Sequence, residues 1–196
     1  MRRGLGAALA AGVVVIGLLV AGCSGDGGGG RAGTGEYALT LTGADVHAVG
    51  PPPAGFPGVQ DAVMETLNAY LTRAVVEPLR TGRAPSDAEE LFTAAAGARL
   101  AGPDRAALVE DGSSGSGRVR QDRAAAKLSA LTGPGGEVVV VTAQLDIGLL
   151  VTSGPTRLAV ARAGEMVLVP DGGAWKIDSY DLRTQRDSPP PPGVPG

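Results

Sequence analysis

The stretch VVVVTAQLDIGL, residues 138–149, decides the fold of this chain. Its odd-numbered residues are all apolar, whereas Thr142, Gln144 and Asp146 fall on even-numbered positions. Because successive side chains of a strand point to opposite faces, this alternation predicts a long strand with one buried face. The run GPGG at 133–136 lies just before it and predicts a hairpin turn.

Further strands are predicted after this one. Residues 158–169 form the next strand, with Gly164 marking a break or a bulge. The run PDGG at 170–173 turns the chain into a last strand, residues 175–183. Apolar positions in that strand change parity between Ile177 and Tyr180, which predicts a bulge or a strong bend.

The residues before this sheet contain the clearest helix. Apolar residues recur there at three- and four-residue spacing and form one stripe, which predicts a helix with one buried side. The stripe consists of Val59, Val63, Leu67, Tyr70, Leu71 and Ala74. Proline lacks the amide and restricts the residue before it, so this helix is expected to end near Val76 or Glu77, just before Pro78.

Two shorter helices are predicted between the long helix and the strands. Ser86 and Glu89 have the spacing of a capping box, and they predict a helix that ends at Gly97. A third helix follows at 102–108. Residues 119–131 are ambiguous, because AAAKL at 124–128 has helical propensity while the hairpin turn at 133–136 suggests a strand before it.

The order of these elements predicts an α+β fold in a single domain, residues 36–187. Residues 37–42 alternate apolar and polar side chains and predict a half-buried strand at its beginning. Helices then precede a run of strands joined by short turns, which is typical of a sheet with helices on one face. A domain of this size can bury a substantial core.

The beginning of the chain has the three-part layout of a secretory signal. Arg2 and Arg3 precede an uncharged, mostly apolar run of nineteen residues that ends in small residues at Gly22. The only cysteine, Cys23, follows directly, and this placement resembles the lipobox of bacterial lipoproteins. The resemblance implies that residues 1–22 are a signal peptide that is removed, and that Cys23 carries a lipid. The alternative is an uncleaved membrane anchor, because nineteen such residues just span a bilayer.

Both interpretations attach the protein to the cell membrane on its extracytoplasmic face. We prefer the lipoprotein, whose diacylglyceryl group would supply two chains and a long-lived attachment. The glycine-rich residues 23–35 are then expected to be a flexible tether. Residues 188–196 include four consecutive prolines and are expected to be a disordered tail.

Composition argues against several classes of partner. The formal net charge of −3 speaks against a nucleic-acid partner. A single cysteine cannot form an intramolecular disulfide, so stability must come from the core. The only histidine, His47, has neither a second histidine nor a free cysteine beside it, so no metal site and no cofactor are expected.

Two family resemblances add to this interpretation. Helices followed by long strands that end in WKIDSY, residues 175–180, resemble the nuclear transport factor-like superfamily, over about residues 59–183. That resemblance implies a cystatin-like cone, in which N-terminal helices pack on a curved antiparallel sheet. The segments 70–71, 78–82, 91–92 and 103–108 resemble secreted or lipidated proteins of high-GC Gram-positive bacteria. Most proteins of that type have no assigned chemistry.

Candidate site residues follow only from the resemblance, since the sequence contains no phosphate loop, dinucleotide fingerprint or calcium loop. The GSG at 115–117 is part of a low-complexity loop and does not follow an apolar strand, so it is not a nucleophile elbow. Some cone-shaped relatives are acid–base enzymes that use an Asp and a Tyr within a pocket. The candidate pocket residues here are Tyr70, Asp146, Trp175, Asp178 and Tyr180.

We expect these residues not to form a catalytic site. Tyr70 lies on the apolar helix stripe and is expected in the core, whereas Asp146 lies on the polar face of its strand and is expected to be exposed. The predicted function is a non-catalytic binding domain for a protein partner, an envelope component or an apolar ligand. The alternative is a small acid–base pocket enzyme of the isomerase, dehydratase or cyclase kind.

Overall fold

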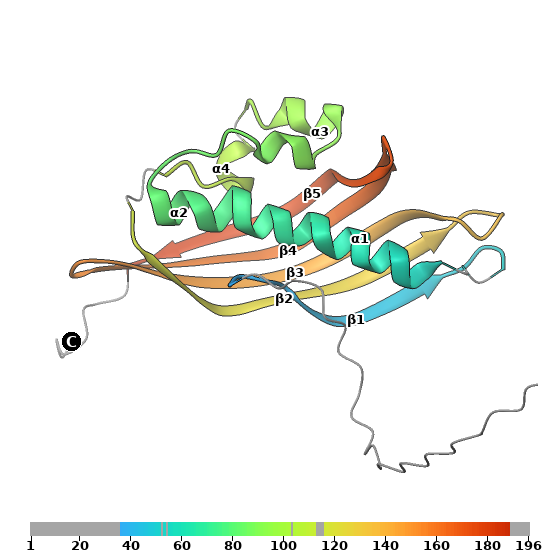
Figure 1. Cartoon of the computed structure of the whole chain (residues 1–196), viewed down its shortest axis with the longest axis horizontal. Coiled ribbons are helices and arrows are strands. Elements are labelled where there is room, and N and C mark those ends of the chain that lie inside the picture. Colours follow the sequence, from blue (N-terminus) through green and yellow to red (C-terminus); the bar gives the residue numbers. More distant parts are fainter. Residues whose placement is uncertain (1–35, 52, 54, 103, 113–115, 189–196) are drawn as a thin grey trace, which may run out of the picture.

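The computed structural model describes residues 36–51, 53, 55–102, 104–112 and 116–188. The predicted signal peptide, Cys23, the tether and the proline-rich tail beyond residue 188 lie outside these residues. Within the described ranges, five strands form one curved sheet, and the helices cover one of its faces (Figure 1). The predicted α+β class is confirmed.

The strands lie side by side in chain order across the sheet. They are β1 (Thr40–His47), β2 (Arg118–Thr132), β3 (Val138–Ser153), β4 (Thr156–Asp171) and β5 (Ala174–Asp187). The strands β2 to β5 are antiparallel and joined by hairpins, whereas β1 runs parallel to β2. The prediction that the whole sheet is antiparallel was therefore wrong at this edge. Parallel neighbours need a long crossover, which here is the helical layer between β1 and β2.

One continuous helical rod lies across the sheet (Figure 1). It consists of α1 (Phe56–Ala69), the π-helical segment η1 (Tyr70–Val76) and α2 (Glu77–Thr81). The rod ends at Gly82, whose φ of 68° is left-handed and favours glycine.

The predicted helix end before Pro78 was wrong, because the helix continues through the proline to Thr81. Pro78 has no amide, so in a regular helix the carbonyl of Ala74 would lose its donor. The amide of Glu110 donates to that carbonyl instead, at 2.9 Å. A residue from a distant segment therefore satisfies the group that the proline leaves unpaired.

The single second helix predicted from Ser86 to Gly97 was also wrong. The structure has a 3-10 turn, η2 (Ala88–Leu91), an extended Phe92 and then α3 (Ala94–Arg99). Phe92 pairs with Ile177 of β5 in a parallel bridge, which interrupts the helix. No side chain caps η2, whereas the hydroxyl of Thr93 caps α3 by accepting from the amide of Ala96. The third predicted helix is α4 (Arg105–Leu108).

Of the two irregularities predicted for β4 and β5, one is absent and the other is present. β4 runs without a break through Gly164, so the interruption expected there was wrong. Gly164 has a φ of 141°, and a Cβ at this position would collide with the carbonyl oxygen of Asp181. The bulge expected in β5 is confirmed, because its register with β4 skips Asp178.

The core lies between the rod and the inner face of the sheet. The predicted alternation in β3 is confirmed, since its odd-numbered residues 141–149 are at most 2% exposed. The ambiguous segment 119–131 is part of a strand, because its alternate side chains complete this buried face. Large core side chains include Met64, Leu67, Leu71, Leu128, Leu145, Ile147 and Met166.

Candidate functional site

A charged cluster lies inside the domain, between the helical layer and β4. Arg162 of β4 and Glu110, which follows α4, form an ion pair with 2.5 Å between Nη2 and Oε1. Their side chains are 0% and 2% exposed. Arg162 points inward because it shares the strand parity of the buried residues Val160 and Met166.

Tyr70 joins this ion pair to the helical rod. Nη1 of Arg162 donates to the Tyr70 hydroxyl at 3.1 Å and to the carbonyl of Ala107 at 2.7 Å. The Tyr70 hydroxyl donates in turn to the carbonyl of Leu108 at 2.8 Å. The rod, the segment at α4 and the sheet are therefore connected through two side chains.

A second arginine reaches the same carboxylate from the end of β5. Nη2 of Arg186 donates to both oxygens of Glu110, at 3.0 and 3.2 Å, and its side chain is 37% exposed. Two guanidinium groups thus share one carboxylate. Nε of Arg162 is buried without a hydrogen-bond partner among the described residues.

Burial determines the protonation of this cluster. It raises the pKa of the Tyr70 hydroxyl, although the neighbouring Arg162 opposes the shift. Burial also lowers the pKa of Arg162, but the interactions with Tyr70 and Glu110 outweigh that effect and raise it. Tyr70 is therefore neutral and Arg162 charged at neutral pH.

This arrangement acts as a structural clamp. Tyr70 and Arg162 are fully buried, and their polar groups bind protein groups rather than facing a substrate. The clamp holds the helical layer against β4, since each partner comes from a different segment.

The candidate residues Tyr70 and Asp146 are not brought together. Tyr70 lies in the core, as its place on the apolar stripe predicts. Asp146 lies on the outer face of β3, where it pairs with Arg123 at 2.6 Å, and both side chains are 54% exposed. The sheet itself separates the two groups, so they cannot act on one bound molecule.

The other candidates lie on β5, beneath the short helices. Asp178, the bulge residue, accepts from the hydroxyl of Thr93 at 3.0 Å. The hydroxyl of Tyr180 donates to Asp104 at 2.9 Å, and burial together with this bond raises its pKa. Trp175 is partly buried against the core. Asp178 and Tyr180 therefore help to attach the short helices to the sheet.

The exposed large apolar side chains of the described residues gather at one corner of the sheet. They are Val46, Val49 and Leu131, which are 37%, 72% and 43% exposed. They lie where β1 and β2 end, since His47 pairs with Leu131 in the parallel register and the amide of Val49 binds Thr132. Val46 pairs with the buried Ala130 and therefore faces the helical side of the sheet, whereas Leu131 faces the outer side, so these side chains flank the sheet edge. We call these three residues the apolar corner.

Two open, polar hollows lie on the outer face of the sheet, the first beside this corner and the second over β3, β4 and β5. One of about 240 Å³ is lined by residues that include Asp45, His47, Lys127 and Glu165. Another of about 450 Å³ is lined by residues that include Gln144, Asp181 and Arg183. Such linings suit the polar groups of a partner better than an apolar ligand.

Sequence reasoning missed Arg162, Glu110 and Arg186. Arg162 carried a usable signal, because it falls on the buried parity of its strand, where an arginine needs a partner. Glu110 and Arg186 carried none, since Glu110 lies in an irregular segment and Arg186 near the end of a strand. Their convergence depends on how α4 packs against β5.

Within the ranges that the structure describes, no group of three or more His, Cys, Asp or Glu side chains could hold a metal ion. No helix in that part of the chain is long and apolar enough to cross a membrane. In comparisons with known proteins, the chain matches no family model, no curated protein and no solved structure.

Proposed function

We propose that this protein is a lipoprotein attached to the extracytoplasmic face of the cell membrane through Cys23, and that its domain binds a protein partner without catalysing a reaction. The observation that carries the binding role is the apolar corner. Exposed apolar side chains are common singly, but here three of them flank the end of an unpaired sheet edge beside a polar hollow, which favours contact with a partner along that edge.

The position of the corner supports a protein partner in particular. Its residues adjoin β1, which is an edge strand paired only with β2. An edge strand offers free backbone donors and acceptors, so a partner strand can add to the sheet there. The corner would supply apolar contacts to the same partner.

The positions and partners of the candidate acid–base residues support a non-catalytic role. Asp146 faces solvent on one side of the sheet, and Tyr70 is buried on the other. Asp178 and Tyr180 are bound to Thr93 and Asp104. A curved sheet packed around a helical rod also supports membership of the nuclear transport factor-like superfamily, which we retain as a proposal (Figure 1).

Site-specific photo-crosslinking in intact cells tests the binding role. A photoreactive residue replaces Val49 in the corner or, as a control, exposed Ser153 at the opposite end of β3. We expect one crosslinked protein at Val49, absent at Ser153 and lost when Leu131 is changed to Asp. The same crosslink in the Asp146→Asn and Asp178→Asn variants would support binding over acid–base catalysis.

The opposite result would change the proposed function. If Val49 and Ser153 gave the same crosslinks, the apolar corner would not be the binding surface. If native mass spectrometry instead found a small molecule that leaves only on denaturation, the domain would be a carrier or a pocket enzyme.

A further inference from the structure

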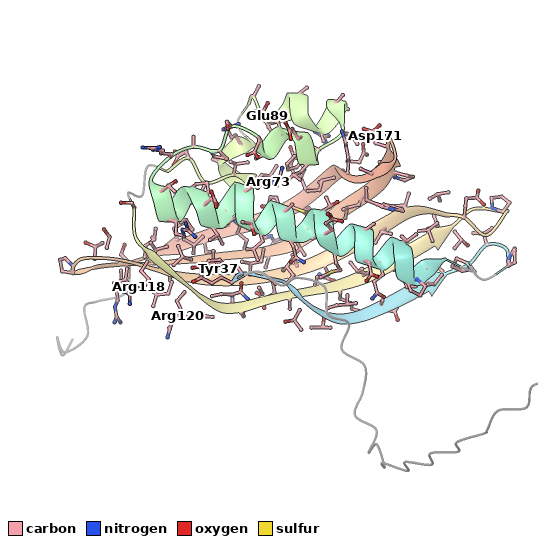
Figure 2. The ribbon with its side chains drawn as sticks, in the orientation of Figure 1. Tyr37, Arg73, Glu89, Arg118, Arg120 and Asp171 are labelled. Carbon is pink, nitrogen blue, oxygen red and sulfur yellow. The ribbon has the colours of Figure 1, made fainter. Side chains whose placement is uncertain are left out.

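The two ends of the sheet differ in charge. Arginines gather at the end where β2 begins and α2 finishes, namely the exposed Arg80, Arg118 and Arg120 and the half-buried Arg157, and we call this the arginine end. Arg118 and Arg157 lie in one row on the outer face, because both pair with Thr152. Figure 2 shows Arg118 and Arg120 at this end and Asp171 at the opposite one.

Acidic side chains dominate the opposite end, which we call the acidic end. They are Asp61 and Glu65 of α1, Glu137 before β3 and Asp171 at the end of β4, all exposed. Lys176 offsets one of them through its ion pair with Asp171 at 3.8 Å. The arginine end is not free of acids, since Glu36, Asp122 and Asp187 lie there and Asp122 pairs with Arg120. Arg118 and Arg157 have no ion pair among the described residues.

The chain enters the domain at the arginine end. The Tyr37 hydroxyl donates to the carbonyl of Val119 at 3.0 Å, directly between Arg118 and Arg120 (Figure 2). Arg80 is also close, since its charge acts on the hydroxyl of Tyr37. The segment that leads back to Cys23 therefore starts among these arginines.

Chain length limits how far this end can lie from the lipid. Thirteen peptide steps separate Cys23 from Glu36, which span at most about 45 Å when fully extended. The sixteen residues of β3 extend over about 50 Å, so the acidic end lies a further sheet length away. With a lipid at Cys23, the chain would therefore keep the arginine end within about 45 Å of the membrane but would place no such limit on the acidic end.

We propose that the arginine end docks on anionic lipid headgroups, so that the domain stands on the membrane with its apolar corner directed away from it. This proposal rests on the proposed lipid anchor at Cys23. An anionic leaflet attracts arginines that lie within a Debye length of it, and it repels the acidic end. A lipid chain and a basic patch together also hold a protein on a membrane more firmly than either alone.

The expected effect is large enough to measure. Each arginine at an anionic surface contributes about fivefold to the docking equilibrium, so removing Arg118 and Arg157 should lower the ratio of docked to undocked domains about thirtyfold. Both residues lie on the protein surface, and the change should not affect folding. The matched control is Lys127→Gln with Lys176→Gln, which removes the same charge from the other half of the sheet.

The experiment uses the full chain as isolated from cells and reconstituted into vesicles. A fluorescent non-natural residue is placed at Gly154 in the hairpin of the arginine end, or at Gly172 in the hairpin of the acidic end. The two positions are matched, because no neighbouring atom opposes a side chain at either and their φ values of 57° and 61° impose a similar strain on both replacements. Energy transfer to a headgroup-labelled lipid reports the height of each position. The vesicles contain phosphatidylglycerol and phosphatidylcholine, or phosphatidylcholine alone.

On phosphatidylglycerol vesicles we expect stronger transfer from position 154 than from 172. The difference should shrink on pure phosphatidylcholine, at high salt and in the Arg118→Gln, Arg157→Gln variant, but not in the lysine control. Equal transfer from both positions on every vesicle would overturn the docking proposal while the anchor remained. Loss of the chain from flotation fractions, together with an unmodified Cys23 by mass spectrometry, would instead overturn the proposed function and the docking with it.

Discussion

Replacing Glu110 with glutamine should destabilise the domain far more than its single lost charge suggests. The change leaves the guanidinium of Arg162, 0% exposed, without its counter-ion at 2.5 Å. Breaking a buried ion pair from one side costs about 3–5 kcal/mol, because the remaining charge stays desolvated. Domains of this size are stable by about 5–15 kcal/mol, so the loss is a large part of the total.

The protein contains a matched control for this experiment. Arg123 and Asp146 form an ion pair of almost the same length, 2.6 Å, but both side chains are 54% exposed. Solvent screens that pair, so Asp146→Asn should lower the free energy of unfolding by less than about 1 kcal/mol. The two substitutions remove the same charge at almost the same distance, and the pairs differ in burial and in the second arginine, Arg186, that binds Glu110.

Urea unfolding followed by circular dichroism measures the loss in the free energy of unfolding for both substitutions. A double-mutant cycle isolates the interaction between Arg162 and Glu110. Arg162→Met alone should also destabilise, because it leaves Glu110 with only Arg186. The double variant should be more stable than the sum of the single losses predicts, by at least about 1.5 kcal/mol. The reasoning would be refuted if Glu110→Gln cost no more than Asp146→Asn, or if the two single losses simply added.

Four other substitutions test separate parts of the structure. Tyr70→Phe should lower the free energy of unfolding by about 1–3 kcal/mol, because the Leu108 carbonyl loses its donor. Burial raises the pKa of folded Tyr70, so the contribution of Tyr70 to stability should be constant below about pH 10 and fall above it, and urea unfolding above pH 10 should show a smaller fall in Tyr70→Phe. In thermal unfolding, Gly82→Ala should cost about 1 kcal/mol at its positive φ, whereas Gly58→Ala in α1 should gain about 0.5 kcal/mol. Leu131→Asp should lower the free energy of unfolding by no more than about 1 kcal/mol, since Leu131 is 43% exposed, yet abolish the crosslink from the photoreactive residue at position 49.

The parts of the fold that follow from local periodicity could be predicted from the sequence. The alternation in 138–149 gave the faces of β3, and the change of parity after Ile177 gave the bulge at Asp178. These features depend on which side of one strand is buried, and that information is contained in consecutive residues.

The predictions that were wrong concern features that depend on residues far away in the sequence. The helix passes Pro78 because Glu110 supplies a donor to Ala74, and the second helix breaks because Phe92 pairs with Ile177. The parallel β1 also reflects the packing of the whole crossover rather than its own residues. In each case a tertiary contact overrides a correct local preference.

The residues of the candidate site likewise include some whose positions follow from local sequence pattern and some whose positions do not. The burial of Tyr70 and the exposure of Asp146 follow from their positions in a helix stripe and a strand. The clamp of Arg162, Glu110 and Arg186 does not, because it joins residues from segments 24 to 76 positions apart. Only the position of Arg162 on the buried face of its strand indicated this cluster.

The central claim, a lipid-anchored binding domain, is tested most directly at Cys23. The full chain is isolated from membranes of cells that express it, and its N-terminal peptide is analysed by mass spectrometry. We predict a peptide that begins at Cys23 and carries the mass of a diacylglyceryl group, and its absence in the Cys23→Ala variant. A chain that still begins at Met1, or one with an unmodified thiol at Cys23, would contradict the account.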